Sequence, residues 1–76
     1  MKSFVLISIK DGKEREMLDV LKEFPEVEDA HILFGEWDVI AKINTSGAEE
    51  LGTFIMDKIR SRGDVSLTSS LIVAGK

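Results

Sequence analysis

Phe34-Gly35-Glu36-Trp37-Asp38 joins two apolar segments, and this short stretch decides how the chain folds. Residues 27–34 before it and residues 37–44 after it have the length and composition of β-strands. Glycine accepts the positive φ that a tight turn requires. The sequence therefore predicts an antiparallel hairpin that turns at Gly35 and Glu36.

The same turn collects groups that recognise a small polar molecule. Trp37 offers a large ring, Asp38 a carboxylate, and the turn itself free backbone amides. Two flanking strands hold such a turn rigidly, as a binding site requires. The structural alternative is an ordinary hairpin, with the tryptophan in the core and the aspartate tying down the loop. Turn composition alone favours that alternative.

Along the whole chain, four strand-like and two helix-like segments alternate. The strands are expected at 4–9, 27–34, 37–44 and 65–73, and the helices between Asp11 and Pro25 and between Ser46 and Gly63. The order βαββαβ predicts an α+β, ferredoxin-like fold with a four-stranded antiparallel sheet and two helices on one face. Right-handed crossovers place the first and third strands in the middle.

Capping signals set the expected helix starts. Asp11 with Glu14 and Ser46 with Glu49 each resemble a capping box, in which a side chain accepts a hydrogen bond from the first turn. The run at 4–9 is apolar almost throughout and predicts a strand buried on both faces.

One face of this sheet has nothing in the chain to cover it. That face carries Leu33, Ile40 and half of residues 4–9. An apolar sheet face of this size implies a partner, and the simplest partner is a second copy packed sheet against sheet.

Composition narrows the class of protein. Residues 1–76 suffice for a single domain. The net charge of −4, without a run of Lys or Arg, argues against direct nucleic-acid binding. Without cysteine, and with one histidine, a metal site is not expected. No segment has the character of a signal peptide or a membrane span, so a cytoplasmic protein without a membrane partner is expected.

Three polar side chains away from the turn are further candidates. His31 could carry a proton or contact a ligand, or could be an ordinary strand residue, which the absence of a paired nucleophile favours. Thr68 and Ser70 share one face of the last strand, where two hydroxyls could hold a carboxylate or ammonium group or simply face solvent. The phenylalanines, Phe34 included, are expected mostly in the core.

Five short motifs along the chain, taken together, indicate a known protein family. They are Lys10-Asp11-Gly12-Lys13 after an apolar strand, Val27-x-x-Ala30-His31, Gly35-Glu36-Trp37-Asp38, Glu50-Leu51, and Val65-x-x-Thr68-x-Ser70-x-Ile72-Val73. Over essentially the whole chain, the sequence resembles the ligand-binding (RAM) domain of Lrp/AsnC transcriptional regulators, the leucine-responsive and asparagine regulators. Trp37 stands where the family usually has tyrosine.

The resemblance implies a function in the regulation of amino-acid metabolism. Homodimers would form through the open sheet face and assemble into octamer- or decamer-like rings, with an amino-acid effector between dimers. The effector-binding residues implied are His31, Leu33, Gly35, Glu36, Trp37, Asp38, Thr68 and Ser70. No cofactor, metal or catalytic residue is expected.

Since Met1 leads directly into a strand, we expect a stand-alone RAM domain without a helix-turn-helix domain, which could also mix with full-length relatives. Two alternatives remain open. One is a small dimeric enzyme of the isomerase or monooxygenase type with His31 as base. The other is an oligomerisation scaffold that binds no ligand.

Overall fold

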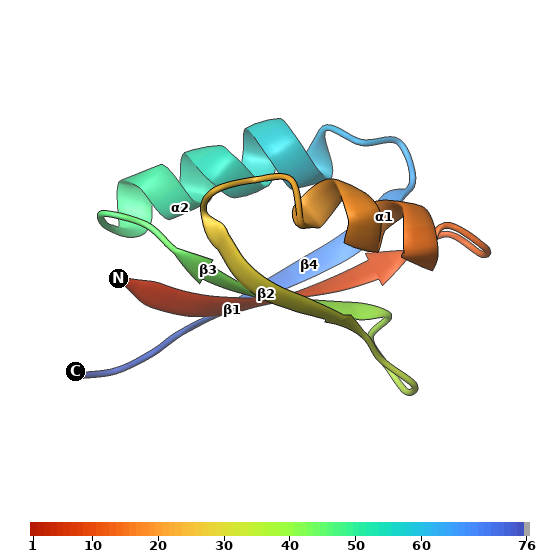
Figure 1. Cartoon of the computed structure of the whole chain (residues 1–76), viewed down its shortest axis with the longest axis horizontal. Coiled ribbons are helices and arrows are strands. Elements are labelled where there is room, and N and C mark those ends of the chain that lie inside the picture. The colour runs from red at the N-terminus through yellow and green to blue at the C-terminus, as the bar shows by residue number, and fades with distance from the viewer. Residues whose placement is uncertain (76) are drawn as a thin grey trace.

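The computed structural model describes residues 1–75 and has the predicted ferredoxin-like fold (Figure 1). The elements, in chain order, are β1 (Lys2–Ile9), α1 (Glu14–Leu21), β2 (Val27–Ile32), β3 (Val39–Asn44), α2 (Ala48–Phe54), η1 (Ile55–Arg60) and β4 (Val65–Ile72). Both helical segments lie on the same face of the sheet (Figure 1). No helix in residues 1–75 is long and apolar enough to cross a membrane.

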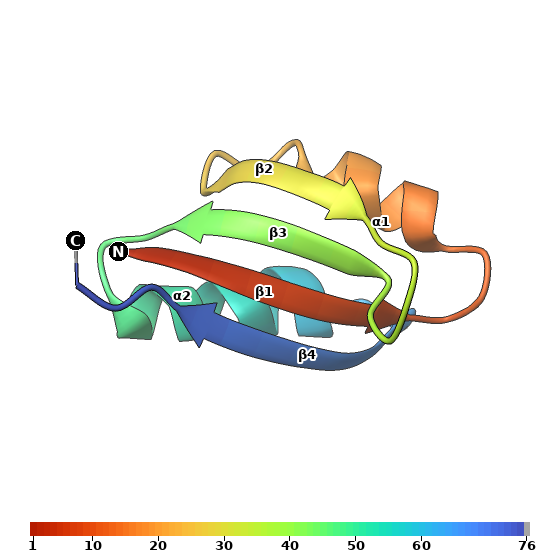
Figure 2. The same cartoon turned by 90° about the horizontal axis from the view of Figure 1, so that it is seen from below.

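The sheet is antiparallel with strand order β2-β3-β1-β4 (Figure 2). The two central strands are β1 and β3, as the crossover rule predicted. Alternate residues of each strand point to opposite faces. Val5, Ile7, Val39 and Ala41 face the helices and are fully buried.

The core lies between this sheet face and the helices. Helix α1 packs over β2 and β3, and η1 packs against β4. Met17, Leu21 and Ile59 are completely buried in this layer. Phe24, in the turn after α1, contacts Phe54 at the end of α2 edge to face, with ring centroids 5.4 Å apart and ring planes at 88°.

The start of α1 differs from the expectation. The helix begins at Glu14 with Lys13 at the N-cap position, and no side chain caps it. The prediction that Asp11 caps this helix is therefore wrong. Gly12 has φ of +83°, and the Lys13 amide donates to the Lys10 carbonyl. This turn uses residues 10–13, so Asp11 lies too early to reach the first helical turn.

The start of α2 is stabilised by a side chain from within the helix rather than by a side chain at the N-cap position. Gly47 is at the N-cap position and Ser46 caps nothing with its hydroxyl. Instead the Ser46 amide donates to Glu50 Oε1 at 2.7 Å. Hydrogen bonding from the Ser46 side chain, together with that from its amide, lowers the pKa of Glu50. The predicted capping box is thus shifted by one residue, from Glu49 to Glu50. Beyond Phe54 the helix widens into the π-helical turns of η1.

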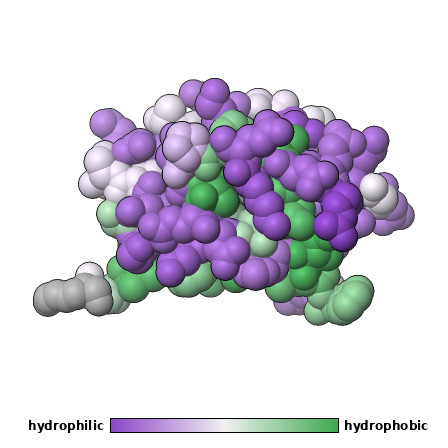
Figure 3. Space-filling view, in the orientation of Figure 1, coloured by the Kyte–Doolittle hydropathy of each residue, from purple (hydrophilic) through white to green (hydrophobic). Residues whose placement is uncertain are grey.

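The second face of the sheet, here called the open face, is covered by no helix of residues 1–75. Two rows of residues cross it: His31, Ile40, Leu6 and Ser69, then Asp29, Lys42, Phe4 and Leu71. Leu67 and Leu71 are 64% and 52% exposed. Hydrophobic surface is visible along this side of the molecule, whereas the helix side is mostly hydrophilic (Figure 3). The prediction that β1 is buried on both faces is therefore wrong for a single chain.

Candidate functional site

The connection between β2 and β3 is a closed loop with a firm base. The Leu33 amide donates to the Asp38 carbonyl at 2.8 Å, and the Asp38 amide donates to the Ile7 carbonyl at 3.0 Å. The strands end at Ile32 and resume at Val39, so the connection is longer than the two-residue turn expected. Gly35 has φ of +140°, a conformation that side chains rarely adopt.

The Asp38 side chain locks this loop onto the central strand. Its Oδ2 accepts a hydrogen bond from the Ile9 amide at 2.7 Å. This is the loop-tying function that the structural alternative predicted. Among residues 1–75 Asp38 Oδ1 accepts no hydrogen bond, so half of the carboxylate stays available for another donor.

The tip of the loop is open. Within the described chain, the amides of residues 34–37 donate no hydrogen bond. Apart from its two chain neighbours, no described residue has an atom within 4 Å of where a Cβ on Gly35 would stand. Trp37 is half-buried. Phe34 is completely exposed, at 105% of its reference area, so its expected place in the core is wrong. It lies two residues beyond Ile32, the last residue of β2, and no side chain of residues 1–75 covers it.

His31 lies on the open face, away from the loop tip. Its Nε2 is 3.1 Å from Asp29 Oδ2, and both side chains are well exposed. The hydrogen bond from His31, together with one from the Ala30 amide, lowers the pKa of Asp29. A shallow hollow of about 90 Å³ holds the pair, lined by Phe4, Asp29, His31, Ile40 and Lys42. Sequence reasoning did not group Phe4 and Lys42 with His31, because only strand register brings them together.

Thr68 and Ser70 lie on the opposite face of the sheet. They pair with Ile7 and Val5, both of which face the helices. Thr68 is half-buried there, and Ser70 is exposed at the sheet edge. One chain therefore brings together Leu33 and residues 35–38 but not these two hydroxyls, nor His31 on the open face.

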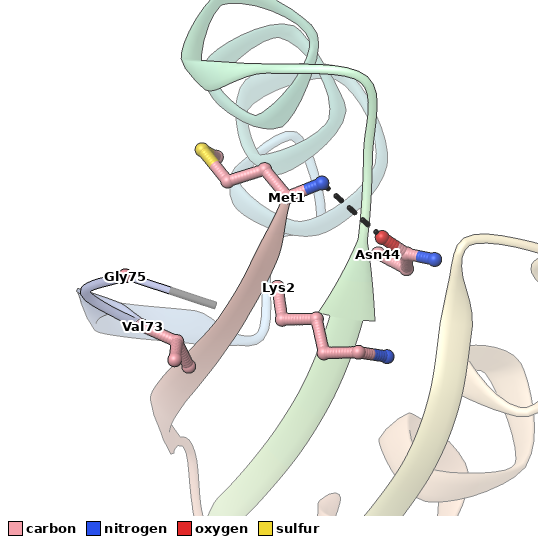
Figure 4. A pocket seen from close by; sticks show the side chains of 5 residues that line it. All are labelled: Met1, Lys2, Asn44, Val73 and Gly75. Carbon is pink, nitrogen blue, oxygen red and sulfur yellow. Dashed lines mark hydrogen bonds between the residues drawn. The ribbon is translucent and has the colours of Figure 1, made fainter.

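A larger hollow of about 270 Å³ lies at the far end of the sheet (Figure 4). It is lined by Met1, Lys2, Asn44, Val73 and Gly75. The Met1 ammonium donates to Asn44 Oδ1 at 3.4 Å beside it (Figure 4). None of the candidate residues lines this hollow. Residues 1–75 contain no group of three side chains able to hold a metal ion.

Comparison with known proteins shows which family the chain belongs to. The family model described as the Lrp/AsnC ligand binding domain matches residues 2–75. The chain belongs to this family. The relatives are regulators of transcription, and the predicted fold class and family are confirmed.

Three relatives illustrate the similarity. The HTH-type transcriptional regulator FL11 of Pyrococcus horikoshii is 36% identical over 73 residues, which are 96% of this chain and 48% of that protein. The crystal structure of FFRP-DM1 has a TM-score of 0.90 and 38% identity, over 95% of this chain and 96% of that one. The transcriptional regulator NMB0573 of Neisseria meningitidis, solved as a complex with L-Met, has a TM-score of 0.88 and 23% identity, over 99% of this chain and 50% of that one.

The chain spans less than half of the length of these curated relatives, which carry HTH-type names. FFRP-DM1, by contrast, is matched over nearly its whole length.

We predict that Asp38→Ala loosens the hairpin from β1. Removing the carboxylate leaves the Ile9 amide without its acceptor, which is expected to lower the free energy of unfolding by about 1–3 kcal/mol. Amide hydrogen exchange measured by NMR should accelerate at Ile9. Glu36→Ala, at the exposed loop tip, is the matched control and should leave Ile9 unchanged. Unchanged exchange in Asp38→Ala would show that the hydrogen bond does not hold the loop.

The His31–Asp29 pair predicts a pH dependence with a definite sign. The folded-state pKa of Asp29 lies below its ordinary value of 3.8, so the pair stabilises the fold above pH 3.8, and that contribution is lost as pH falls through the lower pKa. In a carboxyl NMR titration, His31→Ala should raise the pKa of Asp29 towards 3.8.

Glu28 provides the control for this titration. Its pKa is lowered chiefly by the side-chain hydrogen bond from Lys2, whose Nζ lies 3.0 Å from Oε1. Lys2→Ala should raise the pKa of Glu28 and leave that of Asp29 in place, and His31→Ala should do the reverse. Equal movement of both carboxyl groups in either variant would contradict these pairings.

Proposed function

We propose that this domain binds an amino-acid effector and forms homo-oligomers that regulate the transcription of genes for amino-acid metabolism. The observation that carries the proposal is the loop at residues 33–38. It is anchored at its base by three hydrogen bonds, yet presents amides and one carboxylate oxygen that find no hydrogen-bond partner within residues 1–75. Hydrogen-bond donors and an acceptor that are held in place before binding suit a molecule with both an anionic and a cationic end.

An α-amino acid is such a molecule. Its carboxylate would accept hydrogen bonds from the amides around Gly35 and Glu36, and its ammonium group would donate to Asp38 Oδ1 or Glu36. The L-Met complex of the Neisseria meningitidis regulator, a protein with the same fold, supports an amino acid as the ligand.

The remaining candidate residues fit a site that two subunits complete. Thr68 and Ser70 face away from Asp38 within one chain, so in our proposal their hydroxyls reach the effector from a neighbouring subunit. Leu33 lies at the base of the loop, and His31 shapes the open face beside it. An effector held between subunits stabilises the assembled state because it binds that state preferentially.

The open face would form the homodimer. Phe4, Leu6 and Ile40 are only half-buried on it, and Leu67 and Leu71 are mostly exposed. Covering this surface with a second sheet removes it from water, which is the main driving force for association. We further propose that dimers assemble into octamer- or decamer-like rings, and that the same face admits full-length relatives.

The proposed module acts in the cytoplasm, without a cofactor and without catalysis. Its net charge of −4 does not favour direct contact with nucleic acid, so a DNA-binding partner would carry the signal to DNA. The His31–Asp29 pair at 3.1 Å is what favours the enzyme as a second candidate. The hollow beside it, at about 90 Å³, offers little room for a substrate in one chain.

Thermal unfolding in the presence of each of the twenty amino acids tests effector binding. One or a few should raise the melting temperature in a concentration-dependent way, and light scattering on the same samples should show a change in mass. Gly35→Val should abolish the shift and keep the dimer, because valine strains the backbone there and blocks the approach to the amides. Gly63→Val, at an exposed glycine without positive φ, is the control. If no amino acid shifts the unfolding and the mass stays constant, a ligand-free scaffold or an enzyme is the better account.

Charge placed on the open face tests the dimer. Leu71→Asp should bury an unpaired carboxylate in the interface, weakening association by about 2 kcal/mol or more, roughly 30-fold in the dissociation constant. Analytical ultracentrifugation would measure that constant. Met56→Asp replaces a side chain that is 66% exposed on η1 and should have no effect. A wild-type mass with Leu71→Asp would mean that another surface forms the dimer.

A further inference from the structure

We propose that Phe34 selects the effector, favouring amino acids with apolar side chains over polar or charged ones of similar size. This inference rests on the proposed function, since it concerns the same loop. The residues proposed above to bind the effector do not include Phe34. Its exposure and its position in the loop are what indicate a role in effector selection.

The first argument is exposure. Phe34 is 105% exposed, the largest value among the large hydrophobic side chains of the described residues. A phenylalanine side chain offers roughly 150–250 Å² of surface, and nothing in residues 1–75 covers any of it. An apolar ligand group packed on the ring would remove both surfaces from water.

The second argument is position. Phe34 directly precedes Gly35, whose open side leaves the loop amides accessible. A ligand that places its carboxylate on these amides therefore has its side chain within reach of the adjacent ring. Because Leu33 and Asp38 are hydrogen-bonded at the base of the loop, the backbone that carries the ring is held in place before any ligand arrives.

The third argument is charge. Between Leu33 and Val39 the ionisable side chains are Glu36 and Asp38, both acidic. They oppose an effector with an acidic side chain. A basic side chain would instead pair with Glu36 in water, where exposed ion pairs contribute little. Packing on Phe34 therefore distinguishes one effector side chain from another more strongly than an ion pair with Glu36 does.

The expected discrimination is moderate and measurable. Each methylene group that a ligand buries against the ring should improve affinity about fourfold. Leucine and methionine should therefore bind at least tenfold more tightly than alanine, glutamine, glutamate or lysine. Phe34→Ala should weaken leucine and methionine about tenfold and change alanine less than twofold. Phe34→Leu, which keeps an apolar side chain, should restore most of the affinity.

Isothermal titration of the full chain with these six amino acids tests the proposal, with Phe34→Ala, Phe34→Leu and the control Met56→Ala. Light scattering on each variant without ligand checks the assembly. If the wild-type chain binds none of the six, the proposed function fails and this inference with it. If it binds them but Phe34→Ala leaves their order of affinity unchanged, or lysine or glutamate binds best, the inference alone is overturned. Loss of assembly in ligand-free Phe34→Ala would show that the ring contacts another copy instead, and would also overturn it.

Discussion

The sheet has one apolar face and one partly apolar face, and residues 1–75 supply helices for the first alone. This constraint shapes everything else about the molecule. A chain of 76 residues can build one helix layer, and Val5, Ile7 and Val39 fill that layer with their side chains. The alternate residues of the same strands remain half-exposed on the open face because side chains of a strand alternate in direction. In the proposed function, association with a second copy adds the burial that so small a domain lacks.

In the proposed function, the hairpin between β2 and β3 combines a structural role with ligand recognition in one loop. One oxygen of Asp38 holds the loop against Ile9, and the other accepts no hydrogen bond from the residues that the structure describes. The loop therefore needs no ligand to take its shape, and its amides are placed before binding. Phe34 and Gly35 at the tip contribute nothing to the core, so the stability of the fold imposes little restriction on them. In our proposal such residues set ligand specificity, whereas Asp38 has to serve both the fold and the ligand.

The division of the candidate site across the sheet follows from strand alternation as well. Thr68 and Asp38 lie close along the strand direction but on opposite faces, with β1 between them. A site that uses both must take them from different subunits. In the proposed function, binding and assembly are therefore linked by geometry, without any conformational change within a chain.

By itself, the sequence determined the order of the elements, the central position of β1 and β3, and the existence of an uncovered face. Those features depend on the periodicity of apolar residues, which the sequence shows directly, and on the right-handedness of crossovers, which holds for most folds. Capping was predicted less well, since the turn at residues 10–13 and the reach of Glu50 to Ser46 depend on exact backbone geometry. Only the tertiary structure decided which candidate residues meet. Register placed His31 beside Phe4 and Lys42, and the extended loop carried Phe34 into solvent, because contacts between distant segments are set by strand pairing rather than by spacing along the chain.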